Sequence, residues 1–219
     1  MRIYLVKEYI WREMDVRFIH PFTCVVAGPT GSGKSVFIDK LVRNASDMIA
    51  PPPEKIIWCY GVWQNMYSEM AGVYFVEGLP DIKEIDFSKR HLIIIDDLMK
   101  ETDGRVTQLF TKYSHHSNAS VVYIIQNVFD KNKENRTISL NSHYLVLFKN
   151  PRDATQIVNL AKQMYPGQNR FLKEAYADAT SRPYGYLLID LKQNTPDSVR
   201  IRTNIFPDET CAVYVPKNP

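Results

Sequence analysis

Cysteine is scarce in this chain of 219 residues. The three cysteines are Cys24, Cys59 and Cys211, an odd number in distant segments, with no C-x-x-C spacing and no histidine set beside them. This pattern excludes a disulfide-rich scaffold and indicates no zinc site. A reducing, intracellular environment is the one that fits such cysteine usage.

Long apolar runs are also lacking. The strongest ones, such as 92–95 and 121–125, have the length of a strand, whereas a membrane helix needs about 20 apolar residues. Residues 1–9 mix charged with apolar side chains and lack the continuous apolar core and small-residue cleavage site of a secretory signal. We therefore expect no membrane span and no secretion.

The excess of one charge sign is small, because 27 Lys and Arg face 24 Asp and Glu, a formal charge of +3. Such a charge permits an acidic partner such as nucleic acid without requiring one. With 45% hydrophobic and 23% charged residues, no repeats and no low-complexity segment, the chain has the composition of a globular protein. Its length predicts a single domain, residues 1–219.

Strand-like and helix-like segments alternate through the middle of the chain, which predicts an α/β fold with a mostly parallel central sheet covered by helices. The expected strands are 23–27, 55–60, 73–76, 92–96, 121–126 and 143–148, nearly all of them continuous apolar runs, as in strands buried on both faces. The expected helices are 35–44, one opened by Asp103 with Val106, Leu109, Phe110 and Tyr113 on one face, and one opened by Asp153 with Ile157, Leu160, Ala161 and Met164.

Two further segments carry turn signals. Pro51, Pro52 and Pro53 interrupt the chain after the first helix, and we interpret them as a connection inside the domain. Near the end, 185–191 and 198–204 flank the turn-rich 192–197, which predicts an antiparallel β-hairpin added to the sheet.

The most specific motif is GPTGSGKS, a full match to G-x-x-x-x-G-K-[ST] placed between an apolar strand and a helix. In that position the glycines let backbone amides surround phosphate oxygens, and the helix N-terminus adds partial positive charge. Lys34 is expected to reach the β and γ phosphates, and Ser35 to ligate Mg²⁺. The predicted nucleotide-binding residues are Gly28, Pro29, Thr30, Gly31, Ser32, Gly33, Lys34, Ser35 and Val36.

A second motif, HLIIIDDL at 91–98, supplies the carboxylate that such a site needs at the end of a neighbouring strand. Asp96 is the predicted partner of the magnesium ion. Asp97 lies where many ATPases of this class have a glutamate that polarises the attacking water, so it is a candidate catalytic base. The alternative is an N-cap or turn residue that follows the strand, and we favour the catalytic base.

The next apolar strand ends in Gln126 and Asn127, at the edge where doubly wound sheets bind ligands. Gln126 could sense the γ-phosphate, or simply be a polar residue that marks the strand end. His115 and His116 precede this strand, and adjacent histidines point apart, so we interpret them as structural or contact residues rather than metal ligands.

Arginines from neighbouring subunits often complete such sites, because negative charge develops on the transferred phosphoryl group. Arg136 and Arg152 qualify by position, and we favour Arg136. The segment 129–133, with Phe129, Lys131 and Lys133, is basic with an aromatic residue and could contact a phosphate backbone, although a solvated loop fits it equally well.

With GPTGSGKS, HLIIIDDL and YIIQN in this order and spacing, the chain resembles the additional-strand P-loop ATPases, in which a further strand separates those bearing the lysine and the aspartate. The segments YSHHSNASVVYIIQNVFD, NRTISLNSHYLVLFKNPRD and YLLIDL are more particularly similar to the viral genome-packaging ATPases of the FtsK and HerA superfamily, found in poxviruses, other large DNA viruses, virophages and Polinton-type elements. The resemblance covers about residues 18–207, which leaves a short lead-in and a short tail.

The resemblance implies a homo-oligomeric ring, usually a hexamer, that threads double-stranded DNA through its pore while hydrolysing ATP with Mg²⁺ between subunits. It also implies capsid vertex or portal proteins as partners and a location inside the host cell where virions assemble. The segments 100–105, with Lys100 and Arg105, and 129–133 would then face DNA. Asp97 departs from the family, whose translocases carry glutamate there, so its role as base is less secure than the role of Asp96.

Other functions compete with this one. A small P-loop nucleotide kinase would share the length and the first motif but has no use for the Asp96, Asp97 and Gln126 set. Residues 132–135, NKEN, approach the guanine-reading N-K-x-D but end in asparagine. A terminase with its own nuclease needs a second acidic domain, for which 219 residues leave no room. An ATP-binding scaffold without turnover stays open.

Overall fold

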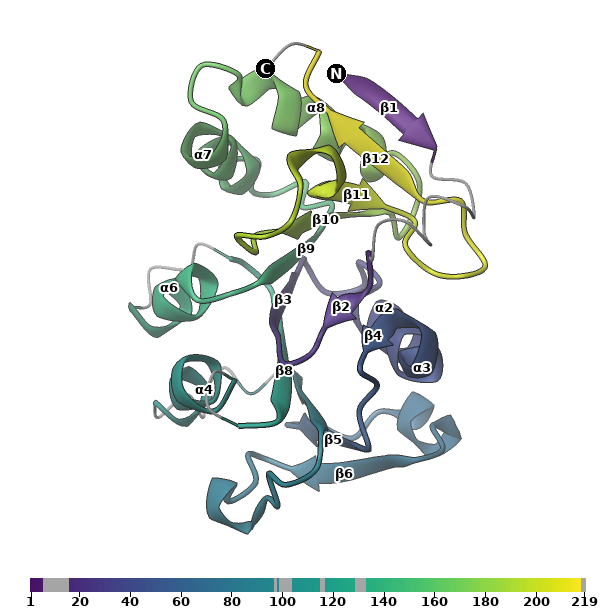
Figure 1. Ribbon diagram of the computed structural model, residues 1–219, viewed down its shortest axis with the longest axis vertical. Coiled ribbons are helices and arrows are strands. Elements are labelled where there is room, and N and C mark those ends of the chain that lie inside the picture. The colour runs from purple at the N-terminus through teal and green to yellow at the C-terminus, as the bar shows by residue number, and fades with distance from the viewer. Residues whose placement is uncertain (6–15, 97, 99–103, 115–116, 129–132, 218–219) are drawn as a thin grey trace.

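A mixed β-sheet forms the centre of the computed structural model, which describes residues 1–5, 16–96, 98, 104–114, 117–128 and 133–217 (Figure 1). Its ten strands lie in the order β1-β12-β11-β10-β9-β3-β8-β7-β5-β6, and β2 and β4 form a separate pair. The strands are β1 (Arg2–Leu5), β2 (Phe18–Ile19), β3 (Thr23–Ala27), β4 (Ile49–Ala50), β5 (Lys55–Tyr60), β6 (Val73–Glu77), β7 (His91–Asp96), β8 (Ala119–Ile125), β9 (Tyr144–Phe148), β10 (Tyr186–Asp190), β11 (Ile201–Thr203) and β12 (Ala212–Val215).

The six strands from β9 to β6 are parallel, as their apolar runs predict. β8 lies between β3, which leads into the glycine-rich motif, and β7, which ends in Asp96. This order is that of the additional-strand P-loop ATPases, so the predicted fold class is confirmed. One strand differs in its surroundings: β6 is the sheet edge and is only partly buried, because it has a neighbour on one side alone.

The predicted hairpin is present as β10 and β11, which pair antiparallel. β10 also pairs antiparallel with β9, and β12 and β1 continue the sheet beyond β11. Two segments outside 18–207 therefore each contribute a strand. Because β1 pairs with β12, the segments near the two ends of the chain lie side by side.

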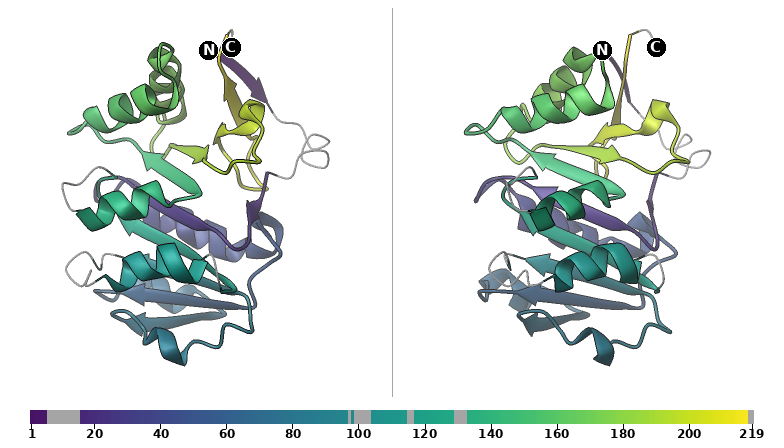
Figure 2. Two further views of the ribbon diagram at one scale, coloured as in Figure 1. Left: turned by 60° about the vertical axis from the view of Figure 1, so that its left-hand side comes forward. Right: turned by 90° about the vertical axis from the view of Figure 1, so that its left-hand side faces the viewer.

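Helices cover both faces of the sheet (Figure 2). The α-helices are α2 (Lys34–Arg43), α3 (Ala45–Met48), α4 (Arg105–Gln108), α6 (Lys133–Leu140), α7 (Thr155–Met164) and α8 (Asn169–Ala179); the 3-10 helices are η1 (Asn65–Glu69), η2 (Ile82–Glu84) and η4 (Asp197–Val199), and η3 (Leu109–Tyr113) is a π-helical turn. α2 and α3 lie on one face, and α4, α6 and α7 lie on the other (Figure 1). The helix expected from Asp103 is α4 followed by η3, and Asp103 itself lies outside the described residues.

The core has two layers, because successive side chains of a buried strand point to opposite faces. In β3, Cys24 and Val26 pack with α2 residues such as Leu41, whereas Val25 and Ala27 belong to the layer under the opposite helices. β3 is therefore buried on both faces up to the point where its carboxyl end meets the glycine-rich motif.

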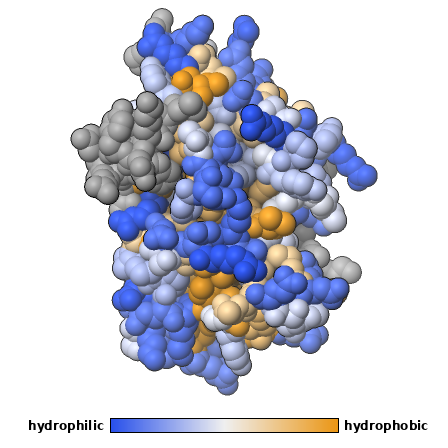
Figure 3. All heavy atoms as spheres, turned by 90° about the vertical axis from the view of Figure 1, so that its right-hand side faces the viewer, coloured by the Kyte–Doolittle hydropathy of each residue, from blue (hydrophilic) through white to orange (hydrophobic). Residues whose placement is uncertain are grey.

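The surface is predominantly hydrophilic on the face shown in Figure 3, where apolar atoms form only small patches. Among the described residues, no helix is long and apolar enough to cross a membrane.

Candidate nucleotide-binding site

The glycine-rich motif forms a tight loop between β3 and α2. Gly28 N–H donates to the carbonyl of Ile125 at 3.2 Å, which ties the start of the loop to the end of β8. Gly31 and Gly33 have φ angles of 77° and 105°, a conformation that glycine adopts without steric cost. A side chain at Gly28 would lie 2.7 Å from Cβ of Phe148, so this position has no room for one.

Lys34 is the first residue of α2, and its ammonium group folds over the loop. Nζ donates to the carbonyls of Gly28 at 2.8 Å and of Pro29 at 3.0 Å. The α2 N-terminus faces the same loop, with Phe37 N–H bonded to the Gly33 carbonyl at 2.9 Å. Cationic side chain and helix terminus therefore converge on one point, the arrangement that binds phosphate groups.

Asp96 is the last residue of β7 and is 5% exposed. Its Oδ2 accepts a hydrogen bond from the hydroxyl of Tyr67 at 3.0 Å. Tyr67 lies in η1 and is itself buried, stacked on Phe75 with ring centroids 4.9 Å apart. The hydroxyl donor is thus fixed in place and holds one oxygen of the carboxylate.

A cavity of about 490 Å³ brings the predicted residues together. Its lining includes Lys34, Ser35, Asp96 and Gln126, which come from α2 and from the carboxyl ends of two neighbouring parallel strands. The complete lining is Thr30, Gly31, Gly33, Lys34, Ser35, Val36, Gln64, Met66, Asp96, Ile124, Ile125, Gln126 and Tyr184. The cavity therefore combines a phosphate cradle with a carboxylate and an amide on one side of it.

The donor set suits Mg²⁺. Hard oxygen ligands are the ones that this ion prefers, and it is commonly held by one or two protein groups together with substrate phosphates. The hydroxyl of Ser35 and the carboxylate of Asp96 line the same cavity. Among the described residues there is no group of three or more His, Cys, Asp or Glu that could hold a metal ion.

The loop also holds a buried hydroxyl that is suited to a ligand. Within the described part of the chain, Ser32 Oγ has no hydrogen-bond partner although it is buried. A buried polar atom without a partner is costly, and a phosphate oxygen would satisfy it.

Asn127 and Val128 anchor the end of β8 to α7. Asn127 Nδ2 donates to Asp153 Oδ2 at 3.1 Å, and Val128 N–H donates to Gln156 Oε1 at 3.1 Å. Asp153 also accepts from Thr155 N–H at 2.9 Å, and these hydrogen bonds lower the pKa of its carboxyl, chiefly through the Thr155 side chain. The predicted helix is present, but it begins at Thr155 with Ala154 as its N-cap, so Asp153 precedes the cap and accepts from the first helical N–H. Gln126, beside this anchor, is exposed and lines the cavity.

The arginines lie apart from this cavity. Arg136 is on α6 and Arg152 follows β9; both are exposed, and neither is among the described residues that line the cavity. Arg105 is the first residue of α4 and is partly buried. Lys133 begins α6. The remaining predicted residues, Asp97, Lys100, Phe129, Lys131, His115 and His116, lie outside the described residues.

Sequence reasoning missed two tyrosines at the site. Tyr67 is in a segment without any recognisable motif, and its proximity to Asp96 arises because η1 follows β5, the strand beside β7. Tyr184 lies between α8 and β10 and reaches the phosphate loop because β10 pairs with β9. Neither position carries a sequence signal stronger than an isolated aromatic residue.

Comparison with known proteins finds similar solved structures. No protein-family model and no curated protein sequence matches the chain. The structure is similar to the genome packaging NTPase B204 from Sulfolobus turreted icosahedral virus 2 in complex with ATP-gammaS, with a TM-score of 0.53, 14% identity, and 83% of this chain and 96% of that chain covered. A second structure of B204, in complex with AMPPCP, has a TM-score of 0.49, 16% identity and covers 84% and 96%.

At 14% identity the likeness shows the fold. The chain has the P-loop NTPase architecture of B204 over nearly the whole length of that protein. This agrees with the strand order seen here, in which β8 separates β3 from β7.

Proposed function

We propose that the protein is an ATPase that translocates double-stranded DNA during the packaging of a viral genome. The observation that carries this proposal is the meeting of Lys34, Asp96 and Gln126 in one cavity at the carboxyl edge of the parallel sheet. The similar fold of B204, whose structure is named for genome packaging and contains ATP-gammaS, supports the choice among P-loop functions.

In this proposal the loop 28–35 binds the triphosphate. Lys34 exchanges its hydrogen bonds to the Gly28 and Pro29 carbonyls for phosphate oxygens, and the Ser32 hydroxyl gains a phosphate oxygen as its acceptor. Mg²⁺, held by Ser35 and Asp96 together with the phosphates, would neutralise charge that develops on the γ-phosphoryl group. Gln126 is placed to contact that group or the attacking water, and Asp97 stays the candidate base.

Coupling to DNA is assigned to segments that follow β7 and β8 in sequence. In sequence, the segments 100–105 and 129–133 come after the strand ends that bear Asp96 and Gln126. A displacement of Asp96 or Gln126 during hydrolysis can therefore be transmitted along the chain to these segments. We further propose a ring, with six subunits as the expected number, in which Arg136 or Arg152 enters the site of a neighbouring subunit. Double-stranded DNA and a capsid vertex or portal protein are the expected partners.

Steady-state ATP hydrolysis by the wild type and by Lys34→Ala, each with and without long double-stranded DNA, tests this function. Lys83→Ala is the matched control, because Lys83 is exposed and lies in η2, away from the cavity. We expect hydrolysis that DNA stimulates, is abolished in Lys34→Ala and is unchanged in Lys83→Ala. Full activity in Lys34→Ala would overturn the proposal, and phosphate transfer from ATP to a nucleoside monophosphate would indicate a kinase instead.

A mixing experiment tests the shared site. Subunits with Arg136→Ala keep an intact phosphate loop, whereas subunits with Lys34→Ala keep the arginine, so a mixed ring contains some complete sites. We expect mixtures to recover part of the hydrolysis that each variant lacks alone. If no ratio recovers activity, and the same holds with Arg152→Ala, the site is not shared between subunits.

A further inference from the structure

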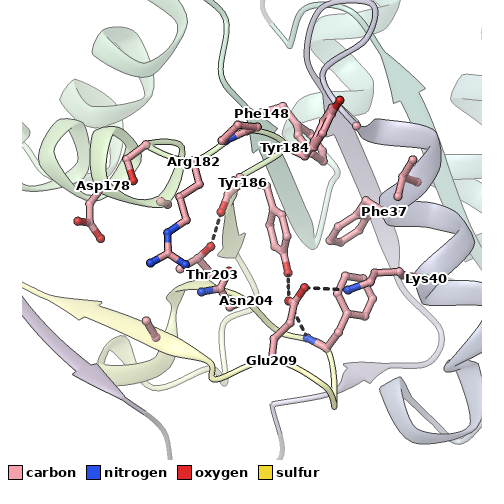
Figure 4. Close-up of a pocket in the computed structure, with 18 of the residues that line it drawn as sticks. Phe37, Lys40, Phe148, Asp178, Arg182, Tyr184, Tyr186, Thr203, Asn204 and Glu209 are labelled. Carbon is pink, nitrogen blue, oxygen red and sulfur yellow. Dashed lines mark hydrogen bonds and ion pairs between the residues drawn. The ribbon is translucent and has the colours of Figure 1, made fainter.

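A second cavity, of about 430 Å³, adjoins the phosphate loop and has no role in the chemistry described above (Figure 4). It shares the lining residues Gly33, Val36 and Tyr184 with the first cavity, so the two cavities are adjacent. Its volume lies in the range of small-molecule sites, about 300 to 1,000 Å³.

The order of the strands fixes which part of a nucleotide this cavity would receive. Asp96 and Gln126 belong to β7 and β8, on one side of β3, and mark the end of the triphosphate where the reaction occurs. The second cavity is lined by Phe148 and Tyr186 of β9 and β10, on the opposite side of β3. A nucleotide whose γ-phosphate faces Asp96 therefore directs its ribose and base toward the second cavity.

Tyr184 lines both cavities. Its ring packs beside the phosphate loop, since a side chain at Gly33 would lie 3.1 Å from both Cβ and the ring atom Cδ1 of Tyr184. It is nevertheless 70% exposed, and Val36, which also lines both cavities, is 58% exposed. Two exposed apolar surfaces at the mouth of a cavity are suited to stacking against a flat base.

The backbone holds Tyr184 in an uncommon conformation. Its φ of 61° is rare for a bulky residue, and it occupies the third position of a turn that Gly185 N–H closes onto the Arg182 carbonyl at 3.1 Å. Glycine is the usual residue at such a position. Gly185 itself has no room for a side chain, because one would lie 2.4 Å from the Ala179 carbonyl, so the turn is pressed against the end of α8.

The polar groups of the cavity differ in whether they already have partners. Glu209 accepts from Lys40 at 2.9 Å, and Asp178 accepts from the Tyr214 hydroxyl at 2.8 Å. The guanidinium of Arg182 extends into the cavity toward Thr203 and has no hydrogen-bond or ion-pair partner among the described residues (Figure 4). It can donate to acceptor atoms of a base or to ribose hydroxyls.

We propose that this second cavity is the nucleoside subsite, in which Tyr184 stacks on the base and Arg182 donates hydrogen bonds to the base or ribose. The proposal rests on the nucleotide-binding function proposed above and goes beyond it, because it separates recognition of the nucleoside from recognition of the phosphates. The ligand class is accordingly a nucleoside triphosphate, not a bare polyphosphate.

Binding of ATP and of inorganic tripolyphosphate, each measured by calorimetry with Mg²⁺, distinguishes the two cavities. Tyr184→Ala and Arg182→Ala should each weaken ATP binding about tenfold while changing tripolyphosphate binding less than about twofold. Tyr184→Phe keeps the ring and should bind ATP as the wild type does. Tyr74→Ala is the matched control, because Tyr74 is equally exposed at 70% and lies on the remote edge strand β6.

The outcomes separate this proposal from the one on which it rests. Unchanged ATP binding in both Tyr184→Ala and Arg182→Ala would overturn the nucleoside subsite. An equal loss of affinity for ATP and for tripolyphosphate would also overturn it, because the turn would then only support the phosphate loop. Lys34→Ala should weaken both ligands. If Lys34→Ala weakens the binding of neither ligand, the proposed phosphate site is wrong, and the proposed nucleoside subsite is wrong as well.

Discussion

The hydroxyl of Tyr67 lies 3.0 Å from Oδ2 of Asp96 and donates a hydrogen bond to it. Both side chains are buried, so the bond forms away from bulk water, where its geometry is well defined. Aromatic rings surround Tyr67 on several sides, from Trp58, Tyr60, Trp63 and Phe75. Tyr67 therefore positions the carboxylate that we assign to the magnesium ion.

Replacing Tyr67 with phenylalanine should affect the Mg²⁺ dependence of hydrolysis more than the stability of the fold. The ring and its packing remain, but Asp96 loses a donor that fixes one of its oxygens. We expect the Mg²⁺ concentration for half-maximal hydrolysis to rise about tenfold, the size of effect seen when a group that orients a metal ligand is removed. A titration of hydrolysis against Mg²⁺ measures this, and an unchanged Mg²⁺ dependence would show that Tyr67 serves packing alone.

Gly28→Ala should disrupt the phosphate loop by steric overlap. The added methyl group would lie 2.7 Å from both Phe148 Cβ and Ser32 Oγ, and Phe148 is held by the Tyr176 hydroxyl on its carbonyl at 2.8 Å. We expect a loss of about 1 to 3 kcal/mol in the free energy of unfolding, as for overpacked positions, together with weaker ATP binding. Urea unfolding and calorimetry give the two quantities.

Gly72→Ala is the control for that substitution. Gly72 has a positive φ of 77° and no atom near a methyl group there, and it lies outside the cavity. It should lose about 1 kcal/mol of stability from backbone strain while binding ATP normally. Equal ATP binding by Gly28→Ala and Gly72→Ala would contradict the steric explanation.

Tyr184→Gly should separate stability from binding. Glycine adopts a φ near 61° without strain, although it also makes the unfolded chain more flexible. We expect the free energy of unfolding to stay level or to rise by up to about 1 kcal/mol relative to Tyr184→Ala, while ATP binding weakens in both variants. Thermal unfolding of the two variants provides the comparison, and a lower stability of the glycine variant would argue against strain at this turn.

His20 should make the protein less stable in mild acid. Burial lowers the pKa of its imidazole, and the positive charges of Arg90 and His91 lower it further. The unfolded chain, in which the group has its ordinary pKa of 6.5, therefore binds more protons than the folded one when the pH falls below that value. The stabilisation is complete above 6.5 and is lost progressively below it.

Unfolding free energies of the wild type and His20→Gln between about pH 7.5 and pH 5 measure this contribution. Glutamine can keep a hydrogen bond to Ser120, whose Oγ lies 2.6 Å from His20 Nδ1. The variant should show a flatter pH dependence over this interval. Parallel curves for the two proteins would assign the acid sensitivity to other groups.

The central part of the fold could be predicted from the sequence because its strands are buried on both faces. Segments such as 92–96 and 121–125 are uniformly apolar, and a run of this kind between polar turns has few alternatives to a parallel strand. The phosphate loop was predictable for a different reason, since its chemistry fixes glycine, lysine and serine at set spacings.

The outer part of the fold depends on contacts that the sequence does not display. β1 and β12 are four residues each, and each is specified by its partner rather than by its own pattern. The same applies to Tyr67 and Tyr184, whose positions beside the site follow from the pairing of β5 with β7 and of β9 with β10. Roles of Asp96, Gln126 and the arginines in the reaction stay predictions until activity is measured.

The pairing of Arg2 with Val215 has a consequence for how the protein forms. β1 precedes its partner β12 by all the other strands in sequence, so every strand from β2 to β11 must be synthesised before this edge of the sheet can close. Contacts between such distant segments form slowly, because a large loop has to be closed first. Until then the exposed edge of β11 is available to other strands, so a chaperone or a neighbouring copy of the chain would meet the nascent protein there first.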